Sequence, residues 1–188
     1  RARDSLEYLA HPVHRHNAFI HIGGGVPFGL VRVVETQPFR SEADYEAWSR
    51  RLRRYPAFLD DTARLMREGM ASGVTTPRVL AERALSQLEG LAPEDMAKSA
   101  LWKPMAQFPA SIDAAGRARL EAEYRRLLAE DTFPAIRRLA AFARSDYLPK
   151  ARTSDGFGAL PNGDAMYRYF VRSDTTTDLA VDEIHALG

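Results

Sequence analysis

Residues 41–73 read SEADYEAWSRRLRRYPAFLDDTARLMREGMASG, and this stretch decides the fold. Apolar side chains recur in it every three or four residues, the spacing that places them on one face of a helix; they are Tyr45, Trp48, Leu52, Tyr55, Leu59, Ala63, Met66 and Met70. Ser41 and Asp44 form a capping-box pattern at the start, and Gly73 marks the end. Because Pro56 interrupts the pattern, we expect either one kinked helix or two in near succession.

The same periodicity continues towards the carboxyl end. An apolar stripe from Val79 to Leu88 predicts a helix that closes at Gly90. The longest helical stretch begins at Ser111 or Asp113 and reaches about Tyr147, with Pro134 inside it. The sequence therefore predicts a mainly α fold, an antiparallel helix bundle with long, proline-kinked helices.

The amino-terminal part lacks this regularity. Two β-rich runs, residues 18–22 and 30–34, flank the glycine-rich residues 23–29, which predicts a small β-hairpin near residues 18–34. No Gly-Lys-Ser/Thr follows the glycines, so a phosphate loop is not indicated. We divide the chain into an irregular segment, residues 1–36, and a helical lobe, residues 37–188, that we expect to be part of a larger domain.

The composition excludes several classes of function. The chain has 188 residues, 26 basic and 25 acidic side chains and a net charge of +1, which provides no overall field for nucleic acid or anionic lipid. It has no cysteine, which excludes thiolate metal sites and cysteine nucleophiles. No apolar run approaches the ~20 residues that span a bilayer. The compartment stays open, because both a cytoplasmic and an exported, processed protein fit this composition.

Two groups of side chains look functional at first sight. Arg50, Arg51, Arg53 and Arg54 lie beside aromatic residues, but interleaved acids and the balanced charge indicate a solvated helix face and not a nucleic-acid site. The second group is histidine, at positions 11, 14, 16 and 21. Imidazoles so close in sequence could bind a transition metal. Their spacing does not fit a helical zinc pair and no carboxylate lies among them, so we expect solvated loop histidines.

The closing stretch, residues 156–188, reads GFGALPNGDAMYRYFVRSDTTTDLAVDEIHALG. A glycine-rich turn leads into a short helix that carries Tyr167, the threonines 175–177 stop that helix, and Glu183 and His185 lie on the next one. A Leu-Pro-x-Gly turn, a following Tyr, a Thr-Thr-Thr run and Glu-Ile-His-x-Leu-Gly occur in this order. In this pattern, and in upstream pieces from about residue 37, the chain resembles the bacterial family known as domain of unknown function 885.

The resemblance implies a helical protein similar to zinc metallopeptidases. In that family a zinc role would rest on a His-Glu pair followed by Pro-Gly-His-His, and no His-Glu dipeptide occurs in these 188 residues. We therefore expect no catalytic residue, metal ligand or cofactor in this chain, although a longer form of the polypeptide could bind zinc. The expected partners are the remainder of the same polypeptide or a peptide substrate, with no nucleic acid.

The resemblance also suggests roles for four residues of the closing stretch. Tyr167 would present its hydroxyl to a substrate beside Gly158 and Gly163, and His185 would pack near the cleft and support it from behind. Each has a structural alternative. Tyr167 could belong to the core, His185 could bond a neighbouring loop, and the glycines could serve positive φ angles or close backbone approach.

Three functions are consistent with these observations. The first is a helical lobe of a zinc-dependent, peptidase-like protein that contributes cleft walls but lacks the metal-binding motif. The second is a non-catalytic helical scaffold or binding module. The third is a protein that keeps the family fold without its activity.

Overall fold

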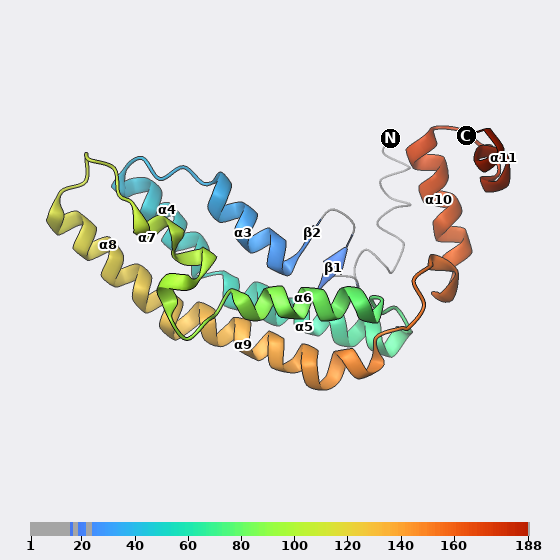
Figure 1. The fold of residues 1–188 in the computed structure, drawn as a ribbon, viewed down its shortest axis with the longest axis horizontal. Coiled ribbons are helices and arrows are strands. Elements are labelled where there is room, and N and C mark those ends of the chain that lie inside the picture. The colour runs from blue at the N-terminus through green and yellow to red at the C-terminus, as the bar shows by residue number, and fades with distance from the viewer. Residues whose placement is uncertain (1–15, 17–18, 22–23, 188) are drawn as a thin grey trace.

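The computed structural model describes residue 16, residues 19–21 and residues 24–187 of the 188-residue chain. These residues form a mainly helical molecule, as predicted (Figure 1). In chain order the elements are the strands β1 (Ile20–His21) and β2 (Gly24–Gly25), α3 (Val26–Thr36), α4 (Glu42–Leu52), α5 (Tyr55–Ser72), α6 (Arg78–Gly90), the short turns η1 (Met96–Lys98) and η2 (Ala100–Trp102), α7 (Lys103–Ala106), α8 (Ala114–Arg126), η3 (Leu127–Thr132), α9 (Phe133–Phe142), η4 (Ala143–Tyr147), η5 (Leu148–Lys150), η6 (Phe157–Ala159), α10 (Gly163–Thr175) and α11 (Val181–Leu187).

The start and the break of the 41–73 region both follow from its residues. Asp44 accepts hydrogen bonds from the backbone N–H groups of Arg40, at 2.9 Å, and Ser41, at 3.0 Å. These bonds, that of Arg40 first, hold the pKa of Asp44 below its usual value. Two helices in near succession, α4 and α5, follow, because Pro56 has no N–H and occupies the first turn of a new helix, where none is needed. Gly73 ends α5 with a φ of 76°.

The long stretch from Ala114 to Tyr147 is continuous but changes its winding twice. Wider π-helical turns, η3 and η4, lie on either side of α9. At the first of them the N–H of Phe133 bonds the carbonyl of Leu128, five residues back, immediately before Pro134. The π turn therefore adapts the helix to a proline that cannot donate a hydrogen bond.

The predicted hairpin is present but smaller than expected. β1 and β2 pair antiparallel, with Ile20 opposite Gly25 and His21 opposite Gly24. The second predicted strand, residues 30–34, is wrong, because it lies within α3. Val26, Leu30 and Val34 are spaced four residues apart and all are buried, so the run reads better as a helix face than as a strand. Pro27 in the first turn favours the same outcome.

The helices pack in one elongated bundle (Figure 1). α4 packs against α8, and α5 against α9. Glu42 pairs with Arg119, and Asp60 pairs with Arg138. These pairs show that the α4–α5 helices and the α8–α9 helices run in the same direction. α6 packs against α9 and runs antiparallel to it, with Glu89 paired to Arg144. The predicted antiparallel packing is thus found between α6 and α9, whereas α4–α5 and α8–α9 run parallel to each other.

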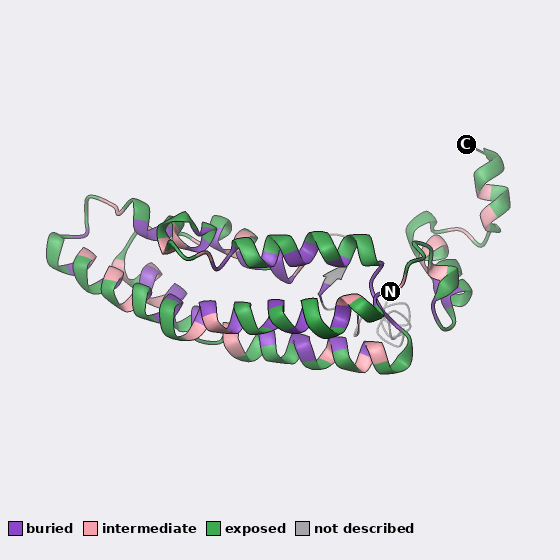
Figure 2. Ribbon diagram, turned by 60° about the horizontal axis from the view of Figure 1, so that its bottom comes forward, coloured by how far each residue is buried: buried purple, intermediate pink, exposed green. Residues whose placement is uncertain are grey.

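The core has a hydrogen-bonded centre. The indole N–H of Trp48 donates to the hydroxyl of Tyr124 at 2.9 Å, and that hydroxyl donates to the carbonyl oxygen of Leu101 at 2.5 Å. The buried residues line the facing sides of the helices, and the opposite sides are exposed (Figure 2). A second, small apolar cluster of Val74, Leu160 and Met166 joins α10 to the end of the bundle. None of the described helices combines the length and the apolar character needed to cross a membrane.

Candidate functional site

The turn before α10 is built by a very close backbone approach. A Cβ atom on Gly163 would overlap the carbonyl group of Phe157 and would lie 3.2 Å from the Cα of Gly158. The turn is closed by hydrogen bonds from the N–H of Leu160 to the carbonyl of Phe157, at 2.8 Å, and from the N–H of Gly163 to the carbonyl of Leu160, at 2.9 Å. The structure therefore brings Gly158 and Gly163 together and gives Gly163 a steric reason to be glycine.

Gly158 has no comparable requirement. A Cβ atom there would lie 3.4 Å from a carboxylate oxygen of Asp164, an ordinary van der Waals separation. Neither Gly158 nor Gly163 has a positive φ, whereas the residue between Pro161 and Gly163, Asn162, does, at 57°. The left-handed position of the turn is thus occupied by asparagine, which tolerates it better than most residues.

Arg152 fastens this turn to the bundle. Its Nε donates to the carbonyl of Thr75 at 2.9 Å, and its Nη1 donates to the carbonyls of Ser154, at 2.7 Å, and Gly156, at 2.8 Å. Burial lowers the pKa of Arg152 from its usual value. One side chain thus holds the loop after the long helix against the loop between α5 and α6.

One face of α10 is packed against the rest of the protein, and the opposite face is exposed. Met166 and Tyr169 are buried, and Phe170 stacks on Phe157 with ring centroids 5.5 Å apart. Tyr167 is 45% exposed and points away from the packed face, so core packing is not its role. A half-exposed aromatic side chain is therefore presented one helical turn after the constrained Gly163.

The threonine run ends α10, as predicted, with a strained residue. Thr176 caps the helix with a φ of 56°, in the left-handed region that β-branched residues rarely occupy. Such a conformation costs about 1–2 kcal/mol in a residue with a Cβ.

Thr176→Gly should consequently stabilise the end of α10, because glycine adopts this conformation without that cost. We expect a gain of about 1 kcal/mol in the local opening free energy, measured by hydrogen exchange of the amides of α10. Thr175→Gly, one residue earlier within the helix, is the matched control and should lower the same free energy. Equal effects of both changes would contradict the assigned strain.

His185 lies apart from Tyr167. It is exposed on α11, whose start is capped by Glu183 accepting a hydrogen bond from the backbone N–H of Ala180 at 2.7 Å. Within residues 24–187, no hydrogen bond or ion pair connects His185 with Tyr167. The structure thus joins Gly158, Gly163 and Tyr167 in one module and leaves His185 on the following helix.

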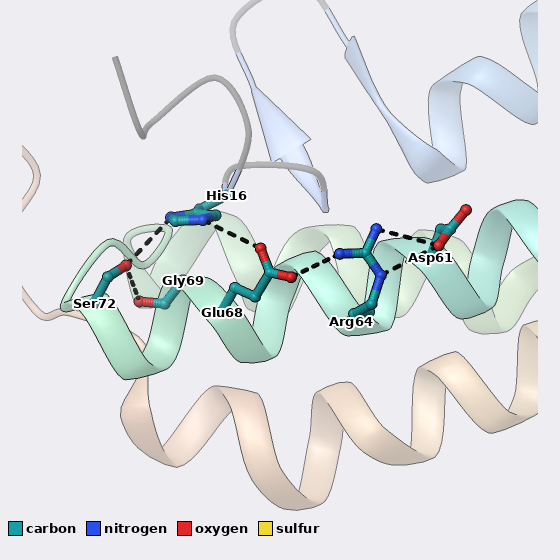
Figure 3. A network of polar contacts seen from close by, with 6 residues as sticks. All are labelled: His16, Asp61, Arg64, Glu68, Gly69 and Ser72. Carbon is teal, nitrogen blue, oxygen red and sulfur yellow. Dashed lines mark hydrogen bonds and ion pairs between the residues drawn. The ribbon is translucent and has the colours of Figure 1, made fainter. Parts of the chain in front are cut away.

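Of the histidines at positions 11, 14, 16 and 21, the structure describes the side chain of His16. It rests on Gly69 of α5, where a Cβ atom would lie 3.0 Å from the Cβ of His16. Its Nδ1 lies 3.2 Å from the hydroxyl of Ser72, and its Nε2 lies 3.6 Å from the carboxylate of Glu68 (Figure 3). His11 and His14 lie outside the described residues, as does the side chain of His21.

These contacts give His16 an anchoring role. Glu68 is also bonded to Arg64, which reaches Asp61, so a chain of polar contacts follows the surface of α5 from His16 (Figure 3). Among the described residues no group of three His, Cys, Asp or Glu side chains could hold a metal ion. These contacts therefore fix the chain at His16 to α5.

A family model described as bacterial protein of unknown function (DUF885) matches residues 7–188. The chain belongs to the DUF885 family. The match begins at residue 7, well before residue 37, where the motifs of the sequence suggested a start, so the DUF885 region includes α3 and the hairpin. Neither the curated proteins nor the solved structures compared with it gave a match.

The site residue that sequence reasoning missed in this DUF885 chain is Arg152. It stands in the loop between η5 and η6, where an arginine ordinarily indicates only a solvated side chain. The only available signal was the position of a long cationic side chain amid residues 148–163, rich in proline and glycine, whose carbonyl groups need donors. Its partner, Thr75, is 77 positions away, beyond the range of any local pattern.

Proposed function

We propose that this chain is the helical lobe of a zinc-dependent, peptidase-like protein, in which it forms the wall of a cleft and contacts a peptide. The module of residues 152–175 provides the contact, and Tyr167 is its central residue. The exposure of Tyr167 on a firmly seated helix is the observation that carries this proposal.

Rigidity behind Tyr167 supports a binding role. The close contact at Gly163 fixes the start of α10, Met166 and Tyr169 fix one face of it, and Arg152 ties the preceding loop to the bundle. A side chain on a helix held in this way loses little conformational entropy when it contacts a ligand. A tyrosine hydroxyl can donate a hydrogen bond to a peptide carbonyl, and to the oxyanion that forms from it during hydrolysis.

The described residues do not supply a zinc site. They contain no group of three suitable ligands, and the sequence of 188 residues contains no His-Glu dipeptide. The described residues accordingly bind and orient the peptide, and none of them holds a metal that takes part in the reaction.

The test is peptide hydrolysis by the complete gene product. Tyr167→Phe, which removes only the hydroxyl, should lower kcat about 10-fold or more with little change in KM, if the hydroxyl acts mainly on the developing oxyanion. Tyr167→Ala, which also removes the ring, should raise KM in addition. Thermal unfolding of both variants should match that of the parent protein, because the side chain is half exposed.

Unchanged kcat and KM in Tyr167→Phe and Tyr167→Ala would remove the assigned role. Among the described residues no hydrogen bond holds the hydroxyl of Tyr167, which favours one alternative, a non-catalytic binding module. In that case the protein would bind peptides without hydrolysing them, and Tyr167→Ala would weaken binding. Isothermal titration with the same peptides distinguishes the two functions.

A further inference from the structure

Four exposed side chains near the α4–α5 joint form what we term the basic–aromatic strip: Arg50, Arg51, Arg54 and Phe58. Phe58 is 51% exposed. The strip faces away from the side that carries the buried Trp48, Leu52 and Leu59. At a rise of 1.5 Å per residue, it spans about 12 Å.

The three arginines of the strip form no ion pair with any residue that the structure describes. The acids around them are already engaged, Glu123 by Arg53, Asp60 by Arg138 and Asp61 by Arg64. The arginines lie on a solvated helix face, as the sequence predicts, and the neighbouring acids do not neutralise them. Three positive charges are left beside one exposed aromatic ring.

Phe58 belongs to a series of edge-on aromatic contacts that leads into the core. The ring of Phe58 meets Tyr55 edge-on at 6.4 Å between centroids, and Tyr55 meets Trp48 in the same way at 6.1 Å. Trp48 is fully buried and hydrogen-bonded to Tyr124. Phe58 is thus held in place and exposed, the combination found in side chains that anchor a binding partner.

We propose that the basic–aromatic strip is a docking surface for an acidic peptide segment that carries an apolar side chain. Carboxylates of the segment pair with Arg50, Arg51 and Arg54, and its apolar side chain packs on Phe58. Arginine suits carboxylate through its fork of donors. This surface is separate from the module of residues 152–175, and binding to it does not depend on the function proposed for that module.

The surroundings favour a short peptide over a nucleic acid or a membrane. Glu46 precedes the strip in the sequence, and Asp60 and Asp61 follow it. A continuous phosphate backbone or a flat anionic bilayer would bring further negative charge against these acids. A peptide of a few residues contacts the arginines and Phe58 alone.

The experiment measures binding of a fluorescein-labelled synthetic peptide in which glutamates flank a pair of leucines, by fluorescence anisotropy at low salt. We expect binding that weakens as salt rises, and no binding of the same peptide with glutamine in place of every glutamate. Arg50→Gln together with Arg54→Gln should weaken binding about fivefold, as expected for two exposed charge pairs. Phe58→Ser should weaken it independently of salt.

The control is Arg32→Gln together with Arg83→Gln, which removes two exposed arginines that also lack a described ion pair but lie on α3 and α6. This variant should bind the glutamate peptide as the parent does. An equal loss of binding in the control, or equal binding of the glutamine peptide, would overturn the proposal. So would stronger binding of a single-stranded oligonucleotide or of phosphatidylserine vesicles, since either would identify a different class of partner.

Discussion

Replacing Gly163 with alanine should detach α10 from the bundle while the main core stays folded. The added methyl group would overlap the backbone carbonyl of Phe157, and a backbone group cannot move aside as a flexible side chain can. The turn from Phe157 to Gly163 must then open, and the small cluster of Val74, Leu160 and Met166 loses its closure. We expect a local loss of about 3 kcal/mol, at the upper end for an overpacked site.

Hydrogen exchange read by mass spectrometry separates local from global loss. Amides from Leu160 to Tyr169 should exchange about 100-fold faster, as a loss of this size implies, whereas amides of α5 and α9 should keep their protection. Gly158→Ala is the matched control, since its methyl group would meet Asp164 at an ordinary distance and should change stability by less than about 0.5 kcal/mol. Unchanged protection in Gly163→Ala would show that the close approach is absent.

The sequence predicts those parts of the fold that depend on residues close together in the chain. Helical periodicity, the Ser41–Asp44 start and the Gly73 end are local, and each is found where it was expected. The branched side chains of residues 30–34 predict a strand, although Leu30 and Val34, together with Val26 before them, also lie on one buried face of a helix. Propensity and periodicity disagreed there, and periodicity, which reports burial, prevailed.

The candidate site depends more on contacts between distant residues. The motif order pointed to Gly163 and Tyr167, but not to the carbonyl of Phe157 that makes glycine necessary, nor to the exposure of Tyr167. The Arg152 bonds to the α5–α6 loop, and the bond from the N–H of Thr76 to the hydroxyl of Tyr147 at 2.8 Å, join residues more than 70 positions apart. Such pairs have no periodic signature, because either partner alone looks like an ordinary polar residue.

These long-range bonds explain how a small module is held firmly on a long bundle. The α5–α6 loop is the shared support. Val74 packs in the small cluster with α10, the carbonyl of Thr75 accepts a hydrogen bond from Arg152, and the N–H of Thr76 donates one to the hydroxyl of Tyr147. A change in this loop is therefore expected to reach Tyr167 through packed and hydrogen-bonded neighbours. The proposed binding role of Tyr167 depends on this support in the same way as it depends on Gly163.

Tyr124→Phe should destabilise the whole bundle by about 3 kcal/mol, which is large for the removal of one oxygen atom. Trp48 would lose the acceptor of its indole N–H, and the carbonyl of Leu101 would lose its donor. Both groups are buried, and each buried polar group left without a partner costs about 1–3 kcal/mol. Burial raises the pKa of Tyr124 above its ordinary value, so the hydroxyl stays protonated and able to donate at neutral pH.

Tyr45→Phe is the matched control for this prediction. Tyr45 is also buried in the core, but its hydroxyl reaches its acceptor, the carbonyl of Gln107, over a long 3.4 Å. Its removal should lower the free energy of unfolding by less than about 1 kcal/mol. Urea unfolding followed by circular dichroism measures both variants, and similar losses would contradict a central role for Tyr124. The difference between the two losses measures the two hydrogen bonds of the Tyr124 hydroxyl, which join α4, α8 and the η2 turn at one point.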